Sequence, residues 1–159
     1  MFLYHGTNVK FSEIDFSMSK PKRDFGKGFY TTTIFEQAEK WANNQFARYG
    51  GDGKFVKVFE YTPVDNLNIL TFKSMSKDWL EFVRENRTQS QDFNIHDYDI
   101  VCGPVANDNT MRTIAFYIAG IYTAEQAIEQ LSYFKVNDQY SFHSEKALSC
   151  LSWKEDREV

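Results

Sequence analysis

The sequence is poor in cysteine and has no long apolar run. Its two cysteines, Cys102 and Cys150, lie far apart and lack the spacing of a metal site, so reduced, buried thiols are the expected state in a cytosolic protein. No stretch approaches the length of a membrane span. The apolar start at residues 1–6 is too short for a signal peptide. We therefore predict a protein with no membrane association that is cytoplasmic or, as the alternative, delivered by a route that the sequence does not show.

An excess of positive charge is also missing. Lys and Arg number 18 against 22 Asp and Glu, which gives a formal net charge of −4 and argues against a domain built to coat nucleic acid. No repeat, low-complexity segment or second domain is visible, so residues 1–159 predict one domain, with a charged tail at 154–159 that is expected to fray. Aromatic residues, by contrast, make up 17% of the chain. Their flat rings suit a sheet core and also stacking on a base or nicotinamide.

Hydrophobic periodicity predicts a mixture of strands and helices. Strands are expected at residues 2–5, 29–33, 54–61, 67–72, 98–105 and 139–143, with 54–61 as a central strand. Helices are expected at residues 34–48 and 76–87, from a cap at Asn107 or Asp108 to Gly120, and after Thr123. Two capping boxes are predicted, one pairing Thr33 with Glu36 and one pairing Thr123 with Gln126.

The stretch from Asp24 to Thr33 is the centre around which we organise the chain. Two glycines flank Lys27, and an aromatic pair that ends in Tyr30 follows at once. Glycine lets a ligand approach the main chain closely, whereas aromatic and β-branched residues favour a strand. A bent loop that leads into a strand and then a helix is suited to a ligand pocket. The alternative is a glycine-cornered hairpin edge in which Tyr30 is simply a core residue.

Two charged clusters lie beside these elements. Lys20, Lys22 and Arg23 precede the glycine-rich loop; such a cluster is ordinarily a solvated surface, but next to a glycine-rich turn it can also bind a phosphate. These three basic residues also leave a small nucleic-acid-binding surface as an alternative. The segment 96–99 holds one His and two Asp residues, but their spacing matches no metal-ligand template, and no metal site is predicted there.

Polar side chains also occupy two strand ends. His5 is followed by the bare backbone of Gly6, and the alternative to a functional role is an imidazole satisfied by a neighbouring carbonyl. In the strand at 139–143, Gln139, Ser141 and His143 share one face because side chains alternate along a strand. This polar face lines a cleft or, as the alternative, belongs to an edge strand in water.

Three separated pieces of the chain resemble the His–Tyr–Glu class of ADP-ribosyltransferases, whose best-known member is the poly(ADP-ribose) polymerase catalytic domain. The pieces are Tyr4-His5-Gly6-Thr7, Phe25-Gly26-Lys27-Gly28-Phe29-Tyr30 and Gln139-Tyr140-Ser141-Phe142. Their order and spread fit across nearly the full chain. The closest resemblance is to a bacterial domain of unknown function, number 3990, which is grouped with these enzymes. The resemblance implies an α+β fold with a split, mostly antiparallel sheet and helices packed around it.

The resemblance also implies roles in binding NAD as co-substrate. His5 would hydrogen-bond the adenosine ribose, the Gly6 backbone would hold the nicotinamide carboxamide, and Tyr30 would stack on the nicotinamide ring. Trp41 lies where the family often has a second stacking aromatic, with a core residue between helix and sheet as the alternative. Further contacts to NAD are implied for Thr7, Gly28 and Thr31.

The third catalytic position departs from the family's pattern. Polymerases have a glutamate there, and this chain has Gln139. An amide can hydrogen-bond the ribose, but it carries no charge and is no base, so polymer growth is not expected. Glu145 is the alternative, since it has the same strand parity as Gln139 if the strand extends that far.

The function implied by the resemblance is NAD-dependent mono-ADP-ribosyl transfer, with His5, Tyr30 and Gln139 as the catalytic set and no metal. A role as a bacterial toxin or conflict module, with an antitoxin or immunity protein as partner, rests on analogy. Two alternatives remain, a non-catalytic module that binds NAD or ADP-ribose and an NAD glycohydrolase. The acceptor stays open among protein, nucleic acid and small molecule.

Overall fold

Two β-sheets form the frame of the protein, for which a computed structural model describes residues 1–106 and 110–159. The three-stranded sheet has the order β1-β3-β7 and is antiparallel, with β1 (Phe2–Thr7), β3 (Phe55–Tyr61) and β7 (Leu151–Glu158). The four-stranded sheet has the order β2-β6-β5-β4, with β2 (Phe29–Thr31), β6 (Asn137–Phe142), β5 (Ile100–Val105) and β4 (Ile69–Thr71). Only β4 and β5 run parallel among the described pairs.

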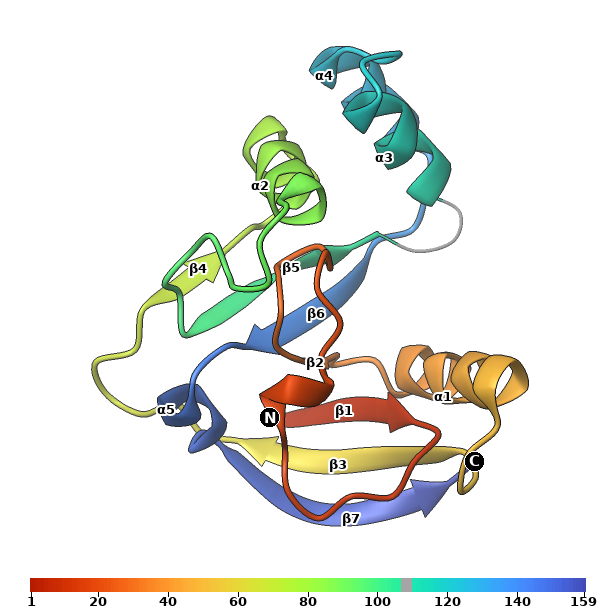
Figure 1. Cartoon of the computed structure of the whole chain (residues 1–159), viewed down its shortest axis with the longest axis vertical. Helices are drawn as coiled ribbons and strands as arrows, with labels where there is room; N and C mark the ends of the chain where they lie inside the picture. The colour runs from red at the N-terminus through yellow and green to blue at the C-terminus, as the bar shows by residue number, and fades with distance from the viewer. Residues whose placement is uncertain (107–109) are drawn as a thin grey trace.

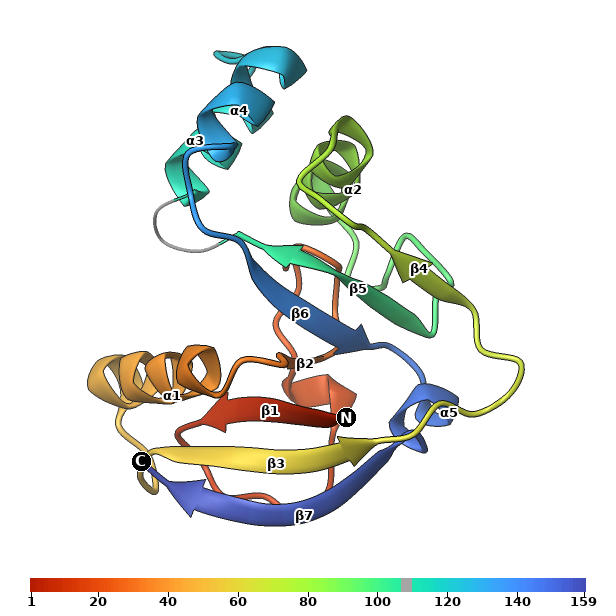
Figure 2. The ribbon, with the colours of Figure 1, turned by 180° about the vertical axis from the view of Figure 1, so that it is seen from behind.

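One long helix lies beside the three-stranded sheet, and most of the other helices lie at the far end of the molecule (Figures 1 and 2). Helix α1 (Phe35–Tyr49) packs beside β1. The remaining described helices are α2 (Lys77–Thr88), α3 (Met111–Ile118), α4 (Ala124–Leu131) and the short α5 (Glu145–Leu148). In both views α2, α3 and α4 gather beyond the four-stranded sheet, far from β7. Within the described ranges, no helix combines the length and the apolar character needed to cross a bilayer.

The middle of the four-stranded sheet is covered on both faces, whereas its edge strand β4 is largely exposed. One face packs against the three-stranded sheet, where Leu3 and Phe59 meet Ile100 and Phe142. The other face packs against α2, α3 and α4, and Val101 belongs to that second core. Strands covered on both faces read as continuous apolar runs, which explains the Ile-Val-Cys run of β5. The predicted α+β class with mostly antiparallel sheets is confirmed, as is the central position of β3.

The predicted helix caps in the C-terminal half are confirmed in part. Thr123 accepts from the backbone of Gln126, and the Gln126 side chain accepts from the backbone of Thr123, so this capping box is confirmed. Helix α3 has Thr110 as its N-cap. The predicted caps Asn107 and Asp108 lie outside the described residues.

The predicted capping box at the start of α1 is wrong. Ile34 is the N-cap and makes no side-chain cap. Thr33 instead gives its hydroxyl proton to the Asp138 carboxylate, which also accepts from the Thr33 backbone N–H at 2.9 Å and from the Thr32 hydroxyl at 2.8 Å. Hydrogen bonds to an ionised carboxylate are roughly twice as strong as neutral ones. A partner 105 residues away therefore displaces the local cap.

The tail is not frayed, because residues 151–158 form β7 against β3. Lys57 of β3 is 4% exposed, and its Nζ lies 2.9 and 2.8 Å from the two carboxylate oxygens of Asp156 in β7. Burial raises the pKa of Asp156, but the bonds from Lys57 and Trp153 outweigh it and hold that pKa below its usual range. A buried ammonium needs such a partner, so β7 neutralises the middle of the sheet.

We expect Asp156→Ala to lower the free energy of unfolding by about 2–3 kcal/mol, because it leaves the buried Lys57 ammonium unpaired. Glu155→Ala is the matched control. It removes an exposed ion pair with Arg157 from the same strand and should cost less than about 1 kcal/mol. Urea unfolding at pH 7 measures both. Equal losses in the two variants would contradict the role given to Asp156.

Candidate functional site

All three histidines of the chain hydrogen-bond the backbone of the segment 25–30. A carbonyl oxygen only accepts, so each imidazole donates through the nitrogen concerned. The three bonds are His5 Nδ1 to Tyr30 O at 2.7 Å, His96 Nε2 to Phe25 O at 2.8 Å and His143 Nδ1 to Lys27 O at 2.8 Å. The histidines come from β1, from the loop before β5 and from the end of β6. The glycine-rich loop is therefore held by three distant parts of the fold.

Desolvation keeps these imidazoles neutral. Burial lowers the pKa of His5 to about 4, against the raising effect of its bond to Tyr30 and with help from the charges of Arg23 and Lys57. Burial likewise lowers the pKa of His143 to about 4, and it lowers that of His96. With Nδ1 of His5 donating, its Nε2 is an unprotonated acceptor at pH 7. Among the described residues, no hydrogen bond occupies that nitrogen.

Asn94 clamps both backbone groups of Lys27. Its Oδ1 accepts from Lys27 N at 2.7 Å, and its Nδ2 donates to Lys27 O at 2.7 Å. Gly26 has a φ of +89°, and a Cβ there would lie 2.4 Å from Asn94 Oδ1. Sequence reasoning missed Asn94, because an asparagine 67 residues away carries no local signal. It is the residue that most directly fixes the turn.

The start of the loop is tied to α2 through an ion pair. Asp24 is 5% exposed and accepts from both Nε and Nη2 of Arg87, the former at 2.7 Å. The backbone N–H of Ala106 donates to its other oxygen at 3.1 Å. Two-point arginine–carboxylate contacts combine charge with fixed geometry. Both carboxylate oxygens of Asp24 thus accept hydrogen bonds from Arg87 or Ala106, and neither accepts one from the neighbouring Arg23.

The two sheets part beside the predicted site. Tyr4 and Thr32 exchange two backbone hydrogen bonds of 2.8 and 2.9 Å, and this isolated bridge links β1 to the chain just after β2. Backbone groups along an antiparallel strand turn alternately to one neighbour and the other, so Gly6 faces the same side as Tyr4. Across the described residues, no strand pairing covers Gly6 on that side. Its N–H and C=O form an unpaired edge where β1 and β2 diverge.

Packing also requires glycine at two predicted site positions. A Cβ on Gly6 would lie 2.0 Å from the carbonyl oxygen of Ala38 in α1. A Cβ on Gly28 would lie 2.6 Å from Nδ1 of His143. Both contacts are far shorter than real Cβ contacts. The two glycines are therefore explained by close packing of helix and ring, whether or not a ligand binds.

Tyr30 is held by its hydroxyl, and its half-buried ring packs against the core that includes Phe25 and Val101. The hydroxyl donates to Gly26 O and accepts from Phe25 N at 3.1 Å, and burial together with the charge of Asp24 raises the pKa of the phenol. Cζ of Arg23 lies 5.3 Å from the centre of the Tyr30 ring and 5.5 Å from that of Trp41. Trp41 is 44% exposed, so its alternative interpretation as a core residue is wrong.

Gln139 is buried but weakly held. It is 5% exposed, and its Nε2 lies 3.5 Å from Pro104 O, an oxygen that already accepts from Trp79 Nε1 at 3.0 Å. Tyr30 pairs with Ser141 across β2 and β6. Since alternate residues of a strand share a face, Gln139 lies on the same face of the four-stranded sheet as Tyr30.

The alternative third residue, Glu145, does not share that face. Strand β6 ends at Phe142, and Glu145 is the first residue of α5 after the cap Ser144. Its side chain is exposed. The parity argument required the strand to continue past His143, and the turn into α5 removes that condition.

The two predicted threonines have partners inside the protein. Thr7 gives its hydroxyl proton to Val9 O at 3.1 Å, and Thr31 gives its own to Tyr140 O at 3.0 Å. Both residues are buried. These hydroxyls hold the strand ends that carry His5 and Tyr30, and Thr7 Oγ1 also accepts from Val9 N at 3.2 Å.

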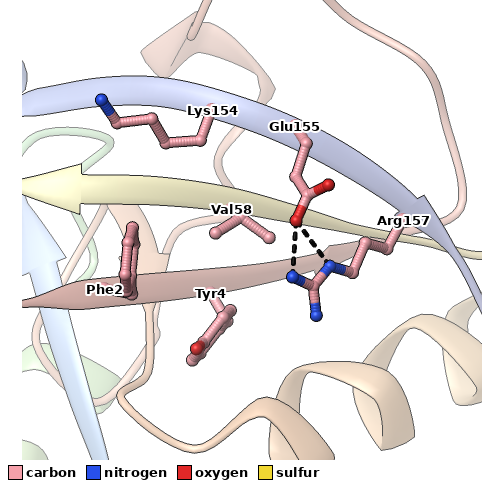
Figure 3. A pocket seen from close by; sticks show the side chains of 6 residues that line it. All are labelled: Phe2, Tyr4, Val58, Lys154, Glu155 and Arg157. Atoms are coloured by element: carbon pink, nitrogen blue, oxygen red, sulfur yellow. Dashed lines mark hydrogen bonds and ion pairs between the residues drawn. The ribbon is translucent and has the colours of Figure 1, made fainter.

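Two hollows lie near the predicted site without being lined by its proposed catalytic residues. One of about 230 Å³ is lined by Phe2, Tyr4, Val58, Lys154, Glu155 and Arg157 (Figure 3), on the face of β1 opposite His5. The other, of about 290 Å³, lies beside Lys27 and His143. Neither is lined by His5, Tyr30 or Gln139. In the part of the chain described, no three His, Cys, Asp or Glu side chains gather as a metal-binding group.

Comparison with known families adds one finding. The model of the family described as protein of unknown function (DUF3990) matches residues 1–153, which include every residue placed above in the loop and at the sheet divergence. No curated protein and no solved structure matches the chain.

The depressed histidine pKa values predict loss of stability in mild acid. A histidine with a pKa of about 4 in the folded state and 6.5 unfolded binds fewer protons when folded, so its contribution is full above pH 6.5 and falls as the pH drops towards 4. Between pH 7 and pH 5 we expect a loss of about 2 kcal/mol for each of His5 and His143. Urea unfolding at the two pH values measures it.

The control for this effect is His143→Gln, which cannot titrate and keeps a donor for Lys27 O. It should reduce the pH dependence by about 2 kcal/mol even if it is less stable at pH 7. Ordinary carboxylates titrate below this window. A wild-type unfolding midpoint that is the same at pH 7 and pH 5 would rule out neutral, buried histidines around the loop.

Proposed function

We propose that this chain, which belongs to the DUF3990 family, is an NAD-dependent mono-ADP-ribosyltransferase. It would transfer ADP-ribose from NAD to an acceptor and release nicotinamide. The observation that carries the proposal is the unpaired backbone edge at Gly6, with His5 and Tyr30 beside it. We assign the two sheets, which part at this point, to the split architecture of ADP-ribosyltransferases.

The edge at Gly6 is complementary to a carboxamide. A primary amide offers one carbonyl acceptor and an NH₂ donor, and a single strand residue offers one N–H and one C=O. Gly6 is buried, and buried backbone groups are almost always paired. Two hydrogen bonds to the amide of nicotinamide would satisfy both groups, each worth about 1 kcal/mol net.

The side chains around the edge suit the rest of the dinucleotide. The Tyr30 ring offers a flat face for the nicotinamide, since its hydroxyl is already fixed by the loop. His5 is neutral at pH 7, and its free Nε2 can accept a hydrogen bond from a ribose hydroxyl. No metal is needed for these contacts.

Gln139 fits a single transfer rather than polymer growth. The bond between ribose C1′ and nicotinamide breaks, its electron pair leaves with the nicotinamide, and the acceptor's lone pair forms the new bond to C1′ while its proton passes to solvent. An oriented amide dipole can oppose the positive charge that develops on the ribose. It cannot take a proton from a further ribose hydroxyl. The weak 3.5 Å contact of Gln139 with Pro104 leaves the amide free to turn.

Two other functions make different use of the same site. The absence of charge at Gln139 favours a module that binds NAD or ADP-ribose without turnover. Water in place of the acceptor would give an NAD glycohydrolase. The acceptor of the transferase can be a protein, a nucleic acid or a small molecule. A toxin role with an antitoxin or immunity protein as partner remains an extension of the proposal by analogy.

We expect Tyr30→Ala to weaken NAD binding at least about tenfold in calorimetry, because stacking on an aromatic ring is worth roughly 1–3 kcal/mol. Tyr30→Phe is the matched control, since it keeps the ring and removes the hydroxyl that holds the loop. It should lose less than about threefold. A Phe variant as weak as the Ala variant would assign the effect to the loop, and a wild type that gives no heat with millimolar NAD would refute the proposal.

Turnover tests the role of Gln139. We expect nicotinamide release, followed by chromatography, from the wild type and none from Gln139→Ala. Gln139→Glu should keep or raise the rate, because it adds a charge opposite the developing cation. Glu145→Ala, which alters an exposed helix residue, should match the wild type.

Each alternative gives its own pattern in that assay. A binding module releases no nicotinamide from the wild type and gains activity only as Gln139→Glu. A glycohydrolase releases nicotinamide but labels no acceptor with radioactive ADP-ribose. Long labelled ladders from the wild type would contradict the single-transfer mechanism.

A further inference from the structure

Arg23 lies in an unusual setting for a half-buried cation. Its guanidinium is 5.3 Å from the Tyr30 ring centre and 5.5 Å from the Trp41 ring centre. Among the described residues, no hydrogen bond or ion pair involves this guanidinium. The adjacent carboxylate, Asp24, is taken by Arg87 and Ala106. Its five N–H donors therefore have no partner among residues 1–106 and 110–159.

Arg23 lies over the Tyr30 ring, on which nicotinamide would stack in the proposed function. A flat guanidinium and a flat pyridine ring compete for the same aromatic face. Arg23 also acts electrostatically on both His5 and Tyr30, which places its charge at the divergence of the sheets.

We propose that Arg23 is a specificity-determining residue that blocks the Tyr30 ring until a pyrophosphate-bearing ligand draws its guanidinium away. The inference rests on the proposed function, in that the ligand is a dinucleotide whose flat ring then takes the vacated face. The partner that Arg23 lacks is supplied by the ligand itself. A free nicotinamide ring would then bind weakly to Tyr30, whereas a dinucleotide would bind because its pyrophosphate displaces Arg23.

The chemistry of the two positions of Arg23 sets the direction of this change. On the rings, the guanidinium is held by attraction to the π faces alone, which is weak where water can reach it. On a pyrophosphate it would form charge-assisted, two-point hydrogen bonds, for which its planar fork is well matched. The exchange is favourable only when the phosphates are present. Ring entry and phosphate recognition are thereby coupled.

The neighbouring lysines fit the same picture without sharing the role. Lys20 Nζ lies 4.9 Å from the ring centre of Tyr49 in α1, so it too sits on an aromatic ring of that helix. Lys22 is exposed, has a φ of +64° and contacts neither Tyr30 nor Trp41 in the described structure. Lys22 therefore offers a matched control, one residue away and of the same charge, that leaves the rings untouched.

The test follows Trp41 fluorescence while wild type, Arg23→Ala and Lys22→Ala are titrated with NAD, nicotinamide and inorganic pyrophosphate. Trp41→Phe supplies the background from the other two tryptophans. In the wild type we expect pyrophosphate to change Trp41 emission and nicotinamide to bind at least tenfold more weakly than NAD. In Arg23→Ala we expect nicotinamide to bind at least tenfold more tightly than in the wild type and pyrophosphate to lose its effect. Lys22→Ala should behave as the wild type with nicotinamide.

The outcomes separate this inference from the proposed function. If NAD binds the wild type but Arg23→Ala binds nicotinamide no more tightly, the blocking role of Arg23 is refuted and the transferase proposal stands. If NAD binds neither protein while pyrophosphate still changes Trp41 emission in the wild type alone, the response of Arg23 stands and the transferase proposal falls. If no ligand changes the emission of either protein, both are refuted. A nicotinamide gain in Lys22→Ala equal to that of Arg23→Ala would reduce the effect to general charge and overturn the inference.

Discussion

The capture of a glycine-rich backbone by remote side chains is the constraint on which the site depends. The segment 25–30 satisfies only part of its own polar groups, through the Tyr30 hydroxyl, and buried backbone groups left unpaired are costly. His5, His96 and His143 supply donors, and Asn94 supplies a donor and an acceptor. The loop is therefore held by residues from both sheets, His5 in β1 and His143 directly after β6. Its geometry is a property of the whole fold.

The same backbone arrangement explains why the candidate site lies where the sheets part. One bridge between Tyr4 and Thr32 joins β1 to the chain after β2. Beyond it, the His5 ring, and not a backbone group of β1, donates to the Tyr30 carbonyl. A side chain thus replaces a ladder hydrogen bond and leaves Gly6 with an open edge. Close packing of Gly6 on α1 prevents the edge from shifting.

The predictable part of this structure is the part encoded locally. The central strand β3, the capping box of α4 and the α+β class follow from periodicity and from residues three apart. Short motifs singled out His5 and the loop around Lys27. The simpler alternative for His5, an imidazole satisfied by a neighbouring carbonyl, is the contact that the structure contains. Asn94 and Asp138 were not found, since each acts on a segment 67 or 105 residues away. Strand β7 was missed because its polar sequence resembles a solvated tail, although Asp156 in it pairs with the buried Lys57.

The dependence of Lys57 on Asp156 also orders events in time. The two residues are 99 positions apart, and ribosomes add roughly 5–20 residues per second. A nascent chain therefore carries β3 for roughly 5–20 s with one open edge and an ammonium that has no counter-charge. During that interval, β1 and β3 can pair as a hairpin-like ribbon, but water must still reach Lys57. The three-stranded sheet is complete, and Lys57 has its counter-charge, only after synthesis has passed β7.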